Sequence, residues 1–325
     1  MSKFSIILPV YNGRTLVKEC VQSILNQTLS GFNLLVLDNH SNDGTLQWIE
    51  SLKDSRIIIY PSEEKLSMEQ NWARAISIPK NEFITLIGHD DILCADYLEE
   101  MNCLIAQHPN ASLYQTHFNY IDGSGNFIRP CMPMDETQYG HEFLACQMAR
   151  TMDSMGTGYM MRSKHFDELG GMHADYPNLI FADYQLWVQL CLISYKATSH
   201  KFCFSYRIHN SISKLTNGEH YQQAFEKYIY FIASILKNEK VKLVVEKYGH
   251  DFLMYFCESL SHRILKTPSS ARKINVAQFI QKCEALAVMI IPGQKFEPLR
   301  KFRINIARKL DANEAGRRAF QFIKN

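Results

Sequence analysis

The residues Phe4-Ser5-Ile6-Ile7-Leu8-Pro9-Val10 give the first indication of the fold, because they form an almost unbroken apolar run. Such runs are typical of strands that are buried on both faces of a parallel sheet. Three more strand-like runs follow, at Phe32–Leu37, Arg56–Tyr60 and Phe83–Ile87. Apolar residues recur at helical spacing between these runs. We therefore predict an α/β fold with a mostly parallel sheet flanked by helices.

The composition describes a globular chain of 325 residues, with 46% apolar residues and a net charge of +2. Balanced charge and many aromatic residues exclude disorder, and the absence of basic excess argues against a nucleic-acid partner. The length suits two domains. Helical periodicity dominates after about residue 219, and Asn217-Gly218 breaks the chain just before it. We predict an α/β domain at 1–214 and a helical C-terminal region at 215–325.

The nine cysteines form no C-x-x-C pair, which favours reduced thiols in a cytoplasmic protein over disulfides or a zinc site. The N-terminus lacks the pattern of a signal peptide. The longest purely apolar run, Ala285–Ile291, has seven residues, far fewer than the ~20 that a membrane-spanning helix needs. The expectation is a cytoplasmic protein, soluble or peripheral at the inner face of the membrane.

Polar loops follow three of the predicted strands, at 11–13, 38–44 and 88–91. Right-handed crossovers bring the carboxyl ends of parallel strands to one edge of the sheet, where ligands bind. Asp90 and Asp91 repel each other unless a cation neutralises them, and a hard divalent cation bound there would hold a diphosphate. The alternative is that they start the next helix, but Asp96 and Glu99 already predict a capping box for that helix.

The other candidate residues each have a structural alternative. Asp38 and Asn39 suit contacts to a base or a ribose, or a tight turn ending at Asp43-Gly44. Asp183 precedes an apolar helix, so it is either an N-cap or a general base. A helix N-terminus would weaken its basicity, because it favours the ionised carboxylate.

Arg207 and His209 share one face of an extended segment, where they could meet phosphate oxygens or a metal, or be structural. Other chemistries are poorly supported, because the chain has no G-x-G-x-x-G, no P-loop, no H-E-x-x-H and no G-x-S-x-G.

Six segments, in the right order, resemble family-2 glycosyltransferases with the GT-A fold. The segments are Ser5–Asn12, Val36–Thr45, Met68–Trp72 with Glu82–Ile84, Ile87–Asp91, Gly170–Met172 with Asp183–Trp187, and Tyr206–Ser213. The fourth resembles the D-x-D metal loop of the family, and the fifth its acceptor-side segment. The resemblance covers about residues 1–214.

The resemblance implies a role for each candidate residue. The donor nucleotide sugar would be bound by Pro9, Tyr11, Asn12, Asp38, Asn39, Asn71, Asp91 and Arg207. Asp90 and His209 would bind Mn²⁺ or Mg²⁺, and Asp183 would be the catalytic base. Three positions depart from the family pattern: Asn39 and Gly88 each replace an Asp, and Ala182 replaces a Glu.

The resulting hypothesis is a metal-dependent, inverting transfer of a sugar from a nucleotide-diphosphate sugar, with UDP as the expected nucleotide, to a hydroxyl of a glycan or a lipid-linked glycan in surface polysaccharide biosynthesis. A non-catalytic nucleotide-sugar binding module and a nucleotidyltransferase are the alternatives. Residues 294–325 alternate basic and apolar side chains, which suits either an anionic membrane surface or the solvated face of a packed helix.

Overall fold

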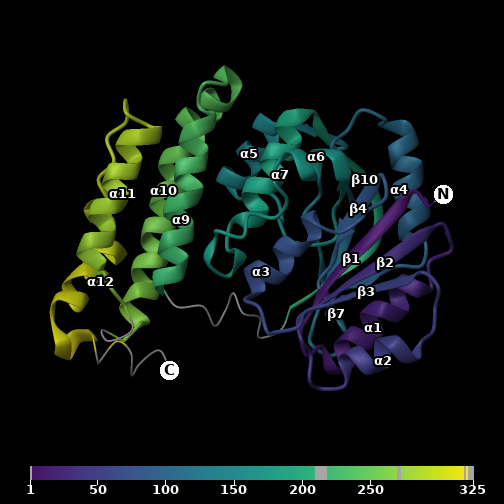
Figure 1. Cartoon of the computed structure of the whole chain (residues 1–325). Coiled ribbons are helices and arrows are strands. Elements are labelled where there is room, and N and C mark those ends of the chain that lie inside the picture. The colour runs from purple at the N-terminus through teal and green to yellow at the C-terminus, as the bar shows by residue number, and fades with distance from the viewer. Residues whose placement is uncertain (1, 209–217, 269–271, 318–319, 321–325) are drawn as a thin grey trace. The chain divides into compact units, whose positions relative to one another are not determined.

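The computed structural model describes residues 2–208, 218–268, 272–317 and 320 (Figure 1). The predicted domain boundary after residue 214 and the predicted metal ligand His209 lie outside these residues. All nine cysteines are free thiols, as predicted.

Ten strands of the described chain form one sheet. They are β1 (Phe4–Val10), β2 (Phe32–Asp38), β3 (Ile57–Pro61), β4 (Phe83–Leu86), β5 (Ile92–Leu93), β6 (Leu113–Ile121), β7 (Phe127–Pro130), β8 (Thr137–Tyr139), β9 (Met160–Arg162) and β10 (Tyr195–Arg207). The strand order is β3-β2-β1-β4-β9-β6-β10-β5, with β7 beside β6 and β8 beside β10.

The helices of the first two-thirds of the chain are α1 (Arg14–Leu25), α2 (Thr45–Ser51), α3 (Met68–Ala73), α4 (Tyr97–Gln107), α5 (Gly140–Ala149), α6 (Ser163–Glu168) and α7 (Ala182–Ile193). The later helices are α9 (Gly218–Ile235), α10 (Glu239–Lys266), α11 (Val276–Ile290) and α12 (Phe302–Ala312). Short 3₁₀ turns are η1 (Arg74–Ile76), η2 (Pro177–Leu179) and η4 (Pro298–Arg300).

The predicted parallel core is confirmed for the first four strands, because β1 pairs in parallel with both β2 and β4, and β2 with β3. Every residue of β1 is buried, which explains its apolar sequence. The strand β9 then runs antiparallel between β4 and β6. The complete sheet is therefore mixed, although β6 and β10 again pair in parallel.

The helix starts differ from the prediction at α4. Asp96 occupies the N-cap position, but its side chain makes no capping hydrogen bond, so the predicted capping box with Glu99 is wrong. A capping box does form at α3, between Ser67 and Gln70. The predicted capping box was the reason to doubt that Asp90 and Asp91 start the next helix. Without it, that reason no longer holds.

The described residues divide into two compact units. The first comprises the described parts of Met1–Phe143, Met152–Asp175 and Ala182–Ser211, and holds the sheet. The second comprises the described parts of Leu144–Thr151, Tyr176–Phe181 and Ile212–Asn325. Two short segments that the sequence analysis places in the first domain thus group with the helices. Packing accounts for the second of them, since the Phe181 ring stacks on Tyr228 with centroids 5.4 Å apart.

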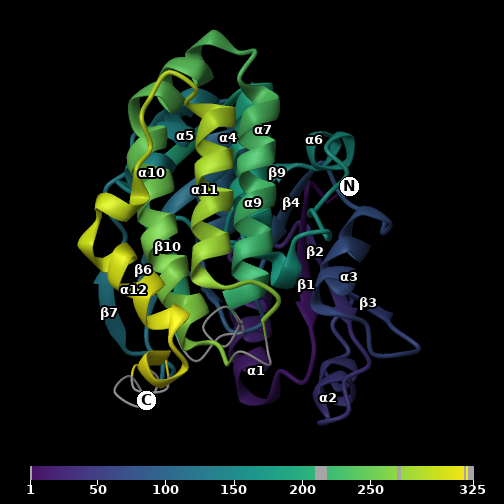
Figure 2. The same ribbon diagram turned by 90° about the vertical axis from the view of Figure 1, so that its left-hand side faces the viewer.

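The second unit is helical, as predicted, and α9, α10 and α11 run alongside one another (Figures 1 and 2). The apolar faces that the sequence indicated form its core, with Phe225, Tyr228, Phe252 and Leu260 buried. Within the described part of the chain, none of the helices has the length and apolar character that crossing a membrane requires.

Candidate active site

Parallel pairing brings three polar loops to one edge of the sheet. The strands β1 and β2 end in register at Val10 and Asp38, and Ile7 of β1 pairs with Leu86 at the end of β4. Pro9 is buried in β1, directly before the first loop. Tyr11 and Asn12, Asp38 to Thr45, and the acid loop, which we define as residues 88–91, therefore all leave the sheet on the same side.

The first two loops are joined by hydrogen bonds. The side-chain amide of Asn12 donates to Asn42 Oδ1 (3.1 Å) and accepts from Asn42 N (2.9 Å). Asp43 accepts from Arg14 N and from Thr45 N. Asn12 and Asp43 thus shape the loops, and Asn12 tolerates the left-handed backbone (φ 50°) that its position requires.

Asp38 has one carboxylate oxygen engaged and one unpaired. Its Oδ2 accepts from Ser41 N (3.1 Å), whereas its Oδ1 is buried and has no hydrogen-bond partner within the described residues. An unpaired buried acceptor is costly, and it is relieved when a ligand donates an N–H. Asp38 is therefore placed as an acceptor for such a donor at the end of β2.

Asn39 and Asn71 bind the backbone around Asp38. The Asn39 amide donates to Leu66 O (2.9 Å) and accepts from Leu66 N (2.8 Å). An Asp could not donate at this position, so the loop contact explains why Asn replaces the family's second Asp. Asn71 is buried, donates to Leu37 O and accepts from Arg74.

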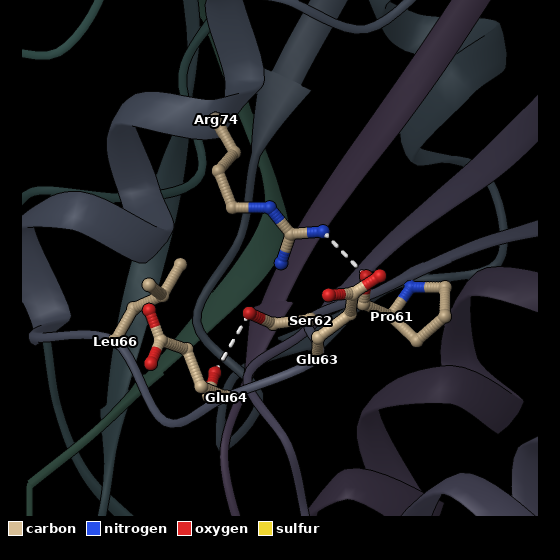
Figure 3. A pocket seen from close by; sticks show the side chains of 6 residues that line it. All are labelled: Pro61, Ser62, Glu63, Glu64, Leu66 and Arg74. Carbon is tan, nitrogen blue, oxygen red and sulfur yellow. Dashed lines mark hydrogen bonds between the residues drawn. The ribbon is translucent and has the colours of Figure 1, made fainter.

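A pocket of about 690 Å³ lies beside these residues and is lined by Pro61, Ser62, Glu63, Glu64, Leu66 and Arg74 (Figure 3). The Arg74 guanidinium donates to the backbone oxygens of Asp38, Tyr60 and Pro61, and so ties the ends of β2 and β3 together. Lys65, in the same loop, places its Nζ 4.6 Å from the ring centroid of Tyr11. The sequence analysis missed Arg74, although it follows Asn71 by one helical turn.

In the acid loop, Asp91 is buried and held from two sides. Thr157 Oγ1 donates to its Oδ2 (2.6 Å), and Arg207 N donates to its Oδ1 (3.0 Å). Burial, and then the charge of Asp90, raise the pKa of Asp91 well above its usual range. The two carboxylates converge: an added Cβ at Gly88 would lie 2.7 Å from Asp90 Oδ1 and 3.0 Å from Asp91 Oδ2. The glycine that replaces the family's Asp leaves room for this arrangement.

Arg207 holds the acid loop in place. Its Nε donates to Asp90 O (2.7 Å), its Nη1 to the backbone oxygens of Asp122 and Gly123, and its Nη2 to Glu19 Oε2 (2.7 Å). The side chain is only 1% exposed. The guanidinium is thus already engaged by protein oxygens. This geometry makes Arg207 a support of the loop. Its contact to the donor stays a prediction.

The acid pair fits a hard divalent cation in the type and convergence of its oxygen donors. A cation would also reduce the repulsion that raises the pKa of Asp91. Within the described residues, which exclude His209, no group of three or more His, Cys, Asp or Glu side chains could hold a metal ion. The protein would thus supply carboxylates to the cation, with phosphate and water as further ligands.

Asp183 is the second residue of α7, not the N-cap that the structural alternative predicts. It is half-buried, and burial raises its pKa to about 6 against the opposing backbone hydrogen bonds of Tyr184 and Asp183. The helix start does lower the pKa of Asp183, as expected, but desolvation outweighs this effect, so the net shift is upward. Ala182, which replaces the family's Glu, is fully buried.

The segment Gly156-Thr157-Gly158 connects these parts, and the sequence analysis missed it. An added Cβ at Gly156 would lie 3.7 Å from Asp183 Oδ2, and the next residue, Thr157, bonds Asp91. A threonine between two glycines was the only signal in the sequence.

Comparisons with known proteins give the family and the fold. The model of the family "Glycosyl transferase family 2" matches residues 5–170. The chain is 24% identical over 335 residues to the GalNAc(5)-diNAcBac-PP-undecaprenol beta-1,3-glucosyltransferase of Campylobacter jejuni, covering 95% of this chain and 100% of that protein. It is 27% identical over 125 residues to the glycosyltransferase GlyG of Streptococcus pneumoniae, which covers 38% of this chain and 42% of GlyG.

Among solved structures, residues 1–349 of S. aureus TarS in complex with UDP-GlcNAc superpose with a TM-score of 0.67 at 14% identity. The superposition covers 98% of this chain and 90% of that one. At this identity the likeness shows the fold, and it confirms the predicted GT-A architecture.

Proposed function

The chain belongs to glycosyl transferase family 2, and on that premise we propose that it transfers a sugar from a UDP-sugar to a hydroxyl of a lipid-linked glycan, with inversion at the anomeric carbon. One observation carries the proposal. The carboxyl group of Asp183, with a pKa of about 6, lies against Gly156, and the next residue, Thr157, donates a hydrogen bond to Asp91 of the acid pair. A separate base and a separate acid pair are what an inverting transfer uses.

Asp183 would act as the general base. With a pKa of about 6 it is mostly ionised at pH 7, and it accepts a proton more readily than an ordinary aspartate. It takes the proton of the acceptor hydroxyl while that oxygen attacks the anomeric carbon. The bond between this carbon and the β-phosphate oxygen breaks, and its electron pair leaves with UDP. Attack from the face opposite the leaving group inverts the configuration.

Asp38 would recognise the nucleobase. Its buried, unpaired Oδ1 is an acceptor suited to the imide N–H of uracil. Guanine would also offer an N–H there, and Asp38 alone therefore does not distinguish the two bases. The TarS complex with UDP-GlcNAc supports the choice of UDP. The pocket beside Arg74 and the ring of Tyr11 lie in the same loop cluster.

Asp90, with Asp91 beside it, would hold the divalent cation, Mn²⁺ or Mg²⁺. A mannosyltransferase of Pyrobaculum calidifontis, whose fold is similar with a TM-score of 0.54, has been solved in complex with GDP-Man and Mn²⁺. When bound, the cation stabilises the negative charge of the departing diphosphate. Arg207 and Thr157 keep the two carboxylates converged for this purpose.

The Campylobacter relative supports the acceptor class, because its name specifies an undecaprenol-linked glycan. A membrane contact through residues 294–325 is part of the same proposal. Phe302 is 76% exposed on α12, but the neighbouring Lys301 and Arg303 both pair with Glu258. Co-sedimentation with anionic vesicles, compared between the whole chain and a truncation at 293, tests this contact.

The donor assignment is tested by thermal unfolding with UDP, GDP and their sugars, with Mn²⁺ or with EDTA. A ligand at 100 times its dissociation constant stabilises the fold by about 2.7 kcal/mol. We expect UDP-sugars with Mn²⁺ to raise the melting temperature, and Asp38→Ala to abolish this rise while Glu50→Gln, on the exposed side of α2, keeps it. A larger rise with GDP-sugars would reject the UDP assignment, and an equal rise in EDTA would reject the metal.

A further inference from the structure

We propose that the segment Gly156-Thr157-Gly158 is a structural bridge that fixes the acid pair relative to the general base, with Thr157 as its positioning residue. The inference rests on the proposed function, since it assigns a role within the same site. The bridge, the acid pair and Asp183 all lie in the first unit.

The bridge is fastened to the strand that leads into the acid loop. Gly158 N donates to Leu86 O at the end of β4 (3.0 Å), and Tyr97 OH donates to Gly158 O (3.4 Å). Gly158 has a left-handed backbone (φ +78°), and an added Cβ would lie 2.6 Å from the ring of Phe204. Only glycine therefore fits here, and this end of the bridge cannot shift without disturbing β4 and β10.

The bridge is also fastened to the helix that carries Asp183. Trp187 Nε1, one turn after Asp183 on α7, donates to Met155 O (3.0 Å). The ring of Tyr159 stacks on Trp187 with centroids 4.5 Å apart. Both rings are fully buried. Contacts on either side of the bridge thus fix its distance from α7.

Between these two anchors, the bridge contacts both carboxylates. Thr157 Oγ1 donates to Asp91 Oδ2 (2.6 Å) and so orients the acid pair. Gly156 leaves room for a methyl group beside Asp183 Oδ2, because a Cβ at this position would meet that oxygen at 3.7 Å, an ordinary contact distance. The acceptor hydroxyl needs such space to reach the base. Adjacent residues of one segment therefore serve the donor side and the acceptor side.

This arrangement predicts that two neighbouring substitutions affect different substrates. Thr157→Val removes the hydroxyl at nearly constant shape. We expect the donor KM and the dissociation constant for UDP with Mn²⁺ to rise about tenfold, the loss typical of one hydrogen bond to a charged group. Thr157→Ser, which keeps the hydroxyl, should restore most of the affinity. Gly156→Ala should lower kcat or raise the acceptor KM at least fivefold, and leave the affinity for UDP intact.

The matched control is Thr116→Val in β6. Thr116 is also buried, but its Oγ1 has no hydrogen-bond partner within the described residues, so its loss should change the kinetics less than twofold. A double-mutant cycle of Thr157→Val with Asp91→Asn checks that Thr157 acts through Asp91, since the two losses should then not multiply.

The bridge is rejected if Thr157→Val behaves like Thr116→Val, if Thr157→Ser is as impaired as Thr157→Val, or if Gly156→Ala is kinetically normal. A failure of the proposed function gives a different result, in which the unaltered protein neither binds UDP nor transfers sugar. Calorimetry of UDP with Mn²⁺ measures the Thr157 effect without turnover. Gly156→Ala is expected to fold, because its φ is not left-handed and its Cβ meets no close atom.

Discussion

The acid loop presents a buried carboxylate, Asp91, and the start of α7 presents a half-buried one, Asp183, and the two are held differently. Asp91 accepts hydrogen bonds from Thr157 and from the backbone of Arg207, and Arg207 in turn binds the neighbouring backbone. For Asp183, the hydrogen bonds that lower the pKa come from backbone N–H groups at the start of its own helix. In the proposed mechanism, the carboxylate that supports the cation is fixed by its partners, whereas the carboxylate that changes its protonation state has room for a methyl group beside it at Gly156.

The largest expected effect is at Asp183. Asp183→Asn keeps the shape and removes the base, so we expect kcat to fall about 10²- to 10⁴-fold. The same variant should be more stable by about 1–2 kcal/mol at pH 7, because the folded protein holds this proton up to a pH of about 6 while the unfolded chain releases it near 4. Transfer assays and urea unfolding measure the two effects. Near-normal transfer by the variant would reject the base.

The pH dependence of kcat/KM tests the role of Asp183 as the base. Only the ionised carboxylate of Asp183 is a base, so kcat/KM should be constant above its pKa of about 6 and fall about tenfold per pH unit below it. Stability should change in the opposite sense. A folded pKa above the unfolded value means that stability decreases as the pH rises from 4 to 6. A rate that stays constant down to pH 4.5 would contradict the assignment.

The support of the acid loop is tested at Arg207, where we expect a smaller effect. Arg207→Lys keeps the charge, but one ammonium cannot bind Asp90 O, Asp122 O and Glu19 together. We expect the donor KM to rise about tenfold with kcat much less affected. Glu19 is half exposed, so Glu19→Gln should raise the donor KM only about twofold. Glu50→Gln serves as the surface control, and equal donor KM values for all three variants would exclude the support role.

The fold of the first four strands was readable from the sequence, because a strand buried on both faces must be continuously apolar. The same alternation placed Asp38, Asp90 and Asp91 at one edge. The antiparallel insertion of β9 was not readable, since β9 spans only Met160–Arg162 and its pairing is a long-range property. The predicted capping box at Asp96 shows the limit of local patterns, because its residues were present and the bond did not form.

The chemical groups of the candidate site can be read along the chain: an acid pair, a separate aspartate and amide side chains in turns. The contacts that each group makes depend on the tertiary fold. In the folded protein, Asn39 and Arg207 form hydrogen bonds with the backbone of neighbouring loops. Asp38 Oδ1 is buried without a hydrogen-bond partner among the described residues, and the pKa of Asp183 is raised. The physical reason is that burial and hydrogen-bond partners come from segments distant in the chain, such as Gly156-Thr157, and no local pattern encodes them.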